Sequence, residues 1–104
     1  DWWNTWFDWF GNDAEGFAEL NDSISQQCRE VGRDPSTVKR SACLLVNVDP
    51  SATERPIPTE YSAANTADVA ARVRELGEAG ADEVILVANP IDERSIGRLA
   101  ELVL

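Results

Sequence analysis

The sequence predicts an α/β protein made of three β/α units, an incomplete part of a parallel TIM (β/α)8 barrel. Apolar strands alternate with amphipathic helices along the chain, and helix-to-strand turns are tighter than strand-to-helix loops. Length agrees, because a complete eight-unit barrel needs about 250 residues and this chain has 104. The prediction is therefore one partial domain over residues 1–104.

The first β/α unit is predicted from an aromatic N-terminal segment and from the apolar stripe of the helix that follows it. All four tryptophans lie in the first ten residues, where Trp2 and Trp3 are expected to end a short strand and Asn4 to begin a loop. A helix is predicted from Ala14 to Val31, with Gly32 ending it in the left-handed conformation. Its apolar stripe consists of Phe17, Leu20, Ile24, Cys28 and Val31.

The next two units repeat this order. Val38–Val48 is a predicted strand with apolar or small side chains on both faces, as in a parallel sheet covered by helices. Residues 49–65 form a loop, which crosses the top of the sheet or links two domains. A helix over Ala67–Ala79 leads to a continuous apolar strand, Val84–Ala88. The last helix is expected to bury Ile96, Leu99 and Val103.

Small polar residues mark the predicted helix starts. Asn12 or Asp13 is expected to cap the first helix, Thr66 the second and Asp92 the last. Such side chains accept hydrogen bonds from the free N–H groups of a first helical turn.

Three parallel strands leave both outer edges without hydrogen-bond partners. If the helices lie on one face, as in a barrel, apolar side chains also remain uncovered on the other face. We therefore expect a chain cut from a longer protein, which needs the remainder of the barrel or a second copy of itself.

The composition excludes several classes of function. The net charge is −10, from 19 acidic and 9 basic residues, which disfavours nucleic acid as a partner because phosphates are held by Lys and Arg. The absence of histidine rules out a Ser-His-Asp arrangement and removes the commonest metal ligand, and a zinc site would need ligands that the chain lacks. No apolar run approaches the roughly 20 residues of a membrane-spanning helix, and Cys28 and Cys43 suggest buried, reduced thiols, so we expect a cytoplasmic protein.

Four segments in order resemble the C-terminal third of the luciferase-like, flavin-dependent oxidoreductases, especially the branch that uses a deazaflavin coenzyme. Asp1–Asn4 resembles the family's Ala-Asp-Gly-Trp-Asn strand end, with Trp2 replacing the glycine. Cys28–Pro35 resembles a helix end and its turn, Val38–Ser41 the next strand, and Gly77–Leu86 the approach to the last barrel strand. The resemblance makes these the last three units of the barrel.

The resemblance implies a parent enzyme that transfers hydride between a flavin or deazaflavin and a small organic substrate, or that activates oxygen as a monooxygenase. FMN or a deazaflavin coenzyme is expected in the intact parent and none in the isolated chain. Most coenzyme contacts in the family come from earlier strands, so no catalytic residue carries over to this sequence.

Candidate site residues lie where strands end. Asn4 and Asn89 are predicted to offer hydrogen bonds to the coenzyme at the pocket rim, or else to cap strand ends. Trp3 and Trp6 are predicted to line a substrate pocket, or else to form a packing plug or subunit interface. The alternative to an enzyme fragment is a non-enzymatic, self-associating half-barrel module; an acidic nucleic-acid mimic rests on charge alone.

Overall fold

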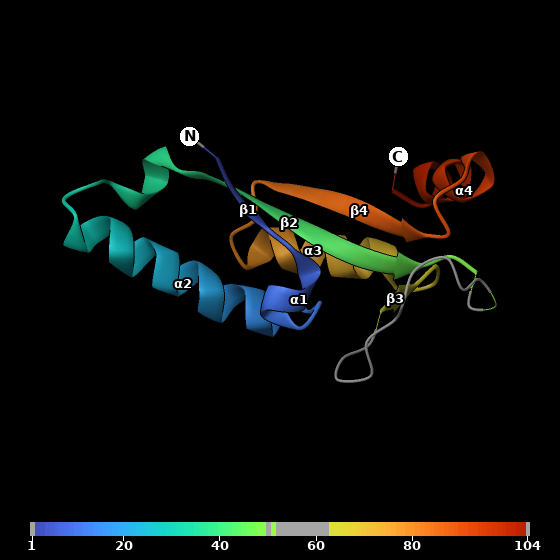
Figure 1. Ribbon diagram of the computed structural model, residues 1–104, viewed down its shortest axis with the longest axis horizontal. Coiled ribbons are helices and arrows are strands. Elements are labelled where there is room, and N and C mark those ends of the chain that lie inside the picture. Colours follow the sequence, from blue (N-terminus) through green and yellow to red (C-terminus); the bar gives the residue numbers. More distant parts are fainter. Residues whose placement is uncertain (1, 50, 52–62, 104) are drawn as a thin grey trace.

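The centre of the molecule is a parallel sheet built around one strand (Figure 1). The computed structural model describes residues 2–49, 51 and 63–103. Its strands are β1 (Trp2–Thr5), β2 (Lys39–Asn47), β3 (Ala64–Asn65) and β4 (Glu83–Asn89). Strand β4 pairs along one edge of β2, whereas β1 and β3 share the other edge, and every pairing is parallel.

Two crossover helices cover the same face of this sheet. The helices are α1 (Phe7–Phe10), α2 (Ala14–Glu30), α3 (Val69–Glu78) and α4 (Glu93–Val103), with a 3₁₀ turn at Pro35–Thr37. Right-handed connections that advance in one direction, from β1 to β2 to β4, place their helices on one face. Accordingly α2 contacts α3, and α3 lies behind β2 in Figure 1. The predicted α/β class is confirmed as a small open parallel sheet.

The register divides the side chains of the sheet between two faces. The Arg40 guanidinium donates to Asn21 Oδ1 and Ser25 Oγ on α2, each at 2.8 Å. Trp3 is in register with Arg40 and stacks on Phe17 of α2, with ring centroids 6.4 Å apart. Because side chains alternate along a strand, β2 has a helix-covered face and an open face. The helix-covered face carries Arg40, Ala42, Leu44 and Val46, and the open face carries Ser41, Cys43, Leu45 and Asn47.

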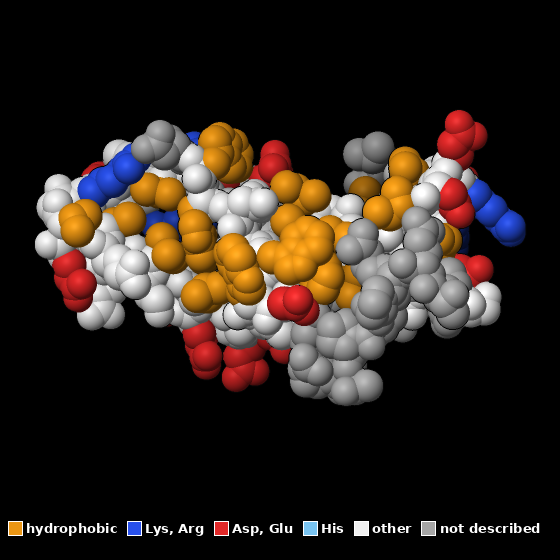
Figure 2. All heavy atoms as spheres, viewed as in Figure 1, with side chains coloured by type: hydrophobic (Ala, Val, Ile, Leu, Met, Phe, Trp, Pro, Cys, Tyr) orange, Lys and Arg blue, Asp and Glu red, His pale blue; other side chains and the backbone are white. Residues whose placement is uncertain are grey.

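The open face of the sheet exposes apolar surface. Figure 2 views the molecule from this side, and hydrophobic side chains gather over β1, α1 and the middle of β2. Trp2 alternates with the helix-facing Trp3 and is 60% exposed. Ile85 of β4, in register with Cys43, is 40% exposed.

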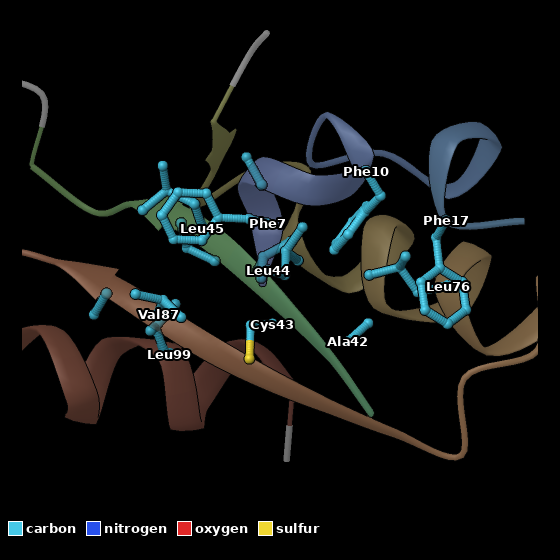
Figure 3. Packing of buried hydrophobic residues seen from close by; sticks show 14 residues of the cluster. Phe7, Phe10, Phe17, Ala42, Cys43, Leu44, Leu45, Leu76, Val87 and Leu99 are labelled. Atoms are coloured by element: carbon cyan, nitrogen blue, oxygen red, sulfur yellow. The ribbon is translucent and has the colours of Figure 1, made fainter. Parts of the chain in front are cut away.

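Most of the buried core lies between the sheet and the crossover helices, but Cys43, Leu45 and Val87 on the opposite face are buried as well. Figure 3 shows Phe10, Phe17 and Leu76, from three different helices, gathered beside Ala42 of β2. The rings of Phe10 and Phe17 meet edge to face, with centroids 5.6 Å apart. Burying one such ring contributes about 1.5–3 kcal/mol. All of β2 from Arg40 to Val46 is buried, which confirms the predicted burial on both faces.

Asn12 fills the gap between the two strands that share one edge of β2. Strand β1 ends opposite Ala42 and β3 begins opposite Val46, so neither pairs with Leu45 between them. The Asn12 side chain fills this gap: Oδ1 accepts from the Leu45 N–H at 2.8 Å, and Nδ2 donates to the Leu45 carbonyl at 3.1 Å. Asn12 is fully buried with a φ of 59°, which Asn tolerates better than most residues. Arg72 of α3 donates to the Asn12 carbonyl at 2.9 Å.

Helix α2 follows the sequence prediction at both ends but not along its whole stripe. The Asp13 carboxylate caps it by accepting from the Gly16 N–H at 2.7 Å. Gly32, with a φ of 78°, takes the expected left-handed conformation. Val31 is 79% exposed, so its predicted place in the buried stripe is wrong. Because the helix ends at Glu30, the Val31 side chain lies beyond the last turn.

The start of α3 corrects a predicted cap. Thr66 does not cap this helix. Asn65, the last residue of β3, accepts instead through Oδ1 from the N–H groups of Ala67 and Asp68, at 2.9 and 3.0 Å. An asparagine side chain readily bonds its own backbone two residues on, which turns the chain from strand into helix. The helix then runs from Val69 rather than from Ala67.

Helix α4 confirms one prediction and overturns another. Asp92 caps its start, accepting from the Ser95 N–H at 2.8 Å. Ile96 and Val103, predicted to be buried, are 57% and 38% exposed. The buried stripe is narrower and is formed by Ser95 and Leu99, on the side where α4 packs against α3 and β4.

Helix α1 and strand β3 were not predicted, and strand β1 ends later than expected. Asn4 continues strand β1, where the sequence suggested a loop. Helix α1 and strand β3 are too short for a periodic pattern to reveal them. Most of the predicted loop over residues 49–65, and with it the expected crossing of the sheet, lies outside the described residues.

Replacing Asn12 tests its two hydrogen bonds to the backbone of Leu45. Asn12→Ala should lower the free energy of unfolding by about 2–5 kcal/mol, because two buried backbone groups of Leu45 each lose a partner. Asn12→Gly should also destabilise, although glycine suits the positive φ. Urea unfolding provides the measurement. Gln27→Ala, at an exposed position of α2, is the control with an expected loss below about 1 kcal/mol, and an equal loss in both alanine variants would contradict the role of Asn12.

Candidate functional site

The carboxyl ends of β2 and β4 bring two asparagines together. Parallel β/α proteins place functional residues at such strand ends. Asn47 and Asn89 are in register, and Asn89 Nδ2 donates to Asn47 Oδ1 at 3.1 Å. The Asn89 carbonyl accepts from the N–H groups of Val48 and Asp49 at 2.9 and 3.1 Å. Asn89 therefore holds the ends of both strands in place.

Two buried oxygen atoms at strand ends have no hydrogen-bond partner among the described residues. They are Oδ1 of Asn89, which ends β4, and Oγ1 of Thr5, which ends β1. Both residues are 0% exposed. An unpaired buried polar atom is destabilising and invites a functional or structural explanation. The Asn89 oxygen is an acceptor suited to an N–H or O–H donor.

Asn4 lies on the open face of the sheet, in the middle of a small polar cluster. Its Oδ1 accepts from Ser41 Oγ at 2.8 Å and from Cys43 Sγ at 3.4 Å. Burial raises the pKa of the Cys43 thiol, the Asn4 hydrogen bond lowers it, and the negative charge of Glu83 raises it further. With a raised pKa, the thiol stays protonated and is a poor nucleophile at neutral pH.

The two asparagines predicted as coenzyme contacts lie far apart along the sheet. Asn4 is in register with Ser41 and Asn89 with Asn47, six positions later on β2 (47 − 41 = 6). At about 3.3 Å per residue, this separation is roughly 20 Å along the strand direction. The chain leaves β1 at Thr5 to form α1, so the first strand stops well short of the end of β2. Asn4 and Asn89 share a face but not a site.

The two candidate pocket tryptophans are packed against phenylalanines. Trp3 lies on the helix-covered face, on the opposite side of the sheet from Asn4, and stacks on Phe17. Trp6 packs against its neighbour Phe7, with ring centroids 4.5 Å apart. Both tryptophans are half-buried, and the structure does not bring them together with Asn89.

A hollow of about 670 Å³ lies beyond the strand ends, lined by residues that follow β2, β3 and β4 and by the first turns of α4. Its lining mixes acids with the guanidinium groups of Arg94 and Arg98. The N-terminus of α4 is occupied by its own cap, Asp92, and Arg98 pairs with Glu101 at 3.4 Å. Hydrogen bonds from Ser51 hold the pKa of the Asp49 carboxyl below its ordinary value. The Asp49 carboxyl is therefore ionised at neutral pH and is unsuited to general acid catalysis.

Over residues 2–49, 51 and 63–103, no group of three or more Cys, Asp and Glu side chains is arranged to hold a metal ion. None of the helices in those ranges combines the length and the apolar character needed to cross a membrane.

Sequence reasoning missed the residues that organise these positions. Asn47 had a usable signal, since β2 and β4 both end with an apolar run followed by asparagine. The alternation along β2 correctly places Ser41 and Cys43 on one face. Their hydrogen bonds to Asn4, however, depend on how β1 is aligned with β2. Register between distant strands is set by tertiary packing, which one sequence does not specify.

Comparison with known proteins adds no family assignment. The sequence matches no protein-family model and no curated protein.

The environment of Cys43 predicts its reactivity. Iodoacetamide at pH 8 should modify the half-buried Cys28 of the folded protein and leave Cys43, which is 3% exposed, unmodified. Peptide mass spectrometry measures both sites, and urea-unfolded protein, in which both should react, is the control. Equal labelling of the two folded cysteines would contradict this assignment.

The raised pKa of the folded Cys43 thiol also makes stability depend on pH. The free energy of unfolding should fall as pH rises above the ordinary thiol pKa of 9.0. Cys43→Ala should remove this part of the alkaline loss.

Proposed function

We propose that this chain forms the last three β/α units of a luciferase-like barrel whose intact parent is a flavin- or deazaflavin-dependent oxidoreductase. The observation that carries the proposal is architectural. Three of the four parallel strands, β1, β2 and β4, are joined by helices on one face, and the two-residue β3 lies between β2 and β4 in the sequence. Neither the outer edge of β1 nor that of β4 has a strand partner among the described residues. Consecutive units of a (β/α)8 barrel have this arrangement.

Polar residues on the open face support the same proposal. In a barrel this face points inward, and the carboxyl ends of the strands form the mouth of the active site. Asn47 and Asn89 lie at that end, and the unpaired Oδ1 of Asn89 is an acceptor for an N–H donor. We assign Asn89 to the pocket rim of the parent enzyme and Asn4 to the inner wall, about 20 Å deeper.

The described residues do not fit a flavin in the isolated chain. Asn89 is fully buried, so a coenzyme ring cannot reach its free acceptor without displacing neighbours. The cationic side chains of the hollow beyond the strand ends are flanked by four acids, which disfavours a coenzyme phosphate. We therefore assign coenzyme binding to the intact parent and no catalytic role to any residue of this chain.

Two measurements test the enzyme-fragment proposal. Titration of the isolated chain with FMN, and separately with a deazaflavin coenzyme, should give no saturable change in flavin fluorescence. The coding sequence upstream of Asp1 should continue in frame for about 200 residues with an alternating strand and helix pattern, since eight units need about 250 in total. A start codon directly before Asp1, or saturable flavin binding by the 104-residue chain, would overturn the proposal.

A second candidate is a non-enzymatic module that associates with a second copy through the open face. The exposed Trp2 and Ile85 on that face favour it, because apolar side chains on a free sheet face are commonly covered by a partner. Pairing through this face predicts a dimer in which Trp2 is shielded from solvent.

Sedimentation velocity and acrylamide quenching separate the two candidates. Association through the open face predicts a wild-type dimer in which Trp2 is shielded from acrylamide. Trp2→Ser should dissociate this dimer to monomers. Trp9→Ser, which removes an exposed tryptophan from α1, is the matched control and should leave the dimer intact. A monomer at micromolar concentration with readily quenched tryptophans would exclude this second function.

A further inference from the structure

A shallow groove lies between α1 and the first half of α2, away from the strand ends. It encloses about 430 Å³, and its described lining consists of Trp9, Phe10, Gly16, Glu19, Leu20 and Ser23. Trp9 is 63% exposed, whereas Phe10 is 4% exposed and belongs to the core. Gly16 allows the two helices to approach closely, because a Cβ there would collide with the Phe10 carbonyl oxygen. The groove thus has a buried base that includes Phe10 and one exposed aromatic side, the Trp9 indole.

The two helices that form this groove carry acidic side chains of their own, and the basic groups nearest in the structure, Arg72 and Arg40, bond Asn12 and the inner side of α2. Residues 2–28 contain neither Lys nor Arg, and their acids are Asp8, Asp13, Glu15, Glu19 and Asp22. Glu15 and Glu19 are exposed and lie one helical turn apart on α2, so their carboxylates occupy the same side of the helix. Figure 2 shows acidic side chains, and no basic ones, along the lower edge beneath α1 and the adjoining end of α2.

We propose that the groove between α1 and α2 binds a basic side chain of a partner peptide, with the cation over the Trp9 indole and its charge near Glu19. A cation is attracted to the face of an indole, and tryptophan is the best of the aromatic residues for this contact. Arginine fits better than lysine, since its planar guanidinium both stacks on the ring and pairs with a carboxylate. The acidic surroundings raise the local concentration of a basic peptide.

The other exposed tryptophan offers no equivalent site and is therefore the natural control. Trp2 lies on the open face of the sheet, in register with Lys39. A cationic neighbour opposes a second cation at that ring. Trp2 and Trp9 are thus similarly exposed and differ chiefly in the charge beside them.

Titration with hexa-arginine tests the proposal, followed by ¹H–¹⁵N NMR of the tryptophan indole signals. The Trp9 indole signal should shift most, and binding should weaken with added salt. Trp9→Leu should weaken the affinity at least about threefold, and Glu19→Gln should weaken it by a similar factor, since each removes one weak contact. Trp2→Leu should bind as wild type, and a Gly-Ser hexapeptide should not bind.

Each result bears on the assignment. Both substituted side chains are exposed, so the variants should keep the wild-type fold, which circular dichroism checks. Wild-type affinity in either Trp9→Leu or Glu19→Gln would overturn the proposal, as would an equal loss in Trp2→Leu, because net charge alone would then explain binding. Trp9→Phe should retain part of the affinity, since a phenyl face attracts cations less strongly than an indole.

Discussion

The fold depends on hydrogen-bond partners for the backbone groups along both edges of β2, and the side-chain amide of Asn12 supplies two of them. A buried strand must place every N–H and C=O group in a hydrogen bond, because water cannot reach them. On the β4 side a single continuous partner meets this need. On the other side two short strands leave a gap at Leu45, and Asn12 occupies it with the donor and acceptor geometry of a peptide group. The position of α1, which precedes Asn12, and that of α3, whose Arg72 bonds the Asn12 carbonyl, are both tied to this contact.

The amino end of β2 is held in a chemically different way. The Arg40 side chain is 7% exposed, and the acceptors assigned to it are neutral oxygens of Asn21, Ser25 and Pro35. Its backbone exchanges two hydrogen bonds with Asp82, one to the carboxylate at 2.8 Å and one from the N–H at 2.7 Å. The guanidinium thus fixes α2 and the turn after it to the sheet. The five N–H donors of the guanidinium lie in a rigid planar fork, which lets one side chain bond several acceptors at once.

The sequence predicts the elements that follow a periodic hydrophobic pattern, and it misses contacts that depend on one particular packing arrangement. The three longest helices and the two longest strands follow from hydrophobic period, and Asp13, Gly32 and Asp92 mark ends through local chemistry that any helix would share. The exposed Ile96 shows the limit of periodicity: an apolar residue marks a possible buried face, but neighbouring elements decide how wide that face is. The candidate site was harder to predict. Asn4 and Asn89 both lie near the end of a strand, but β1 ends much earlier along β2 than β4 does, which separates the two residues. That separation depends on where the chain leaves β1, which no local pattern encodes.

The pairing pattern of β2 has a consequence for how the molecule assembles. Its contacts with Asn4, Asn12 and Asp82 span 37, 33 and 42 positions of sequence. The strand pairs of the described residues are all parallel, so none of them closes through a hairpin. Helices α2 and α3, in contrast, can form from neighbouring residues alone. Chains dominated by such distant contacts fold slowly, because the entropy of closing long loops is lost before the contacts form. During that interval the backbone N–H and C=O groups of β2 have no partners and its apolar side chains are exposed, so the central strand is open to pairing with other chains while the protein folds.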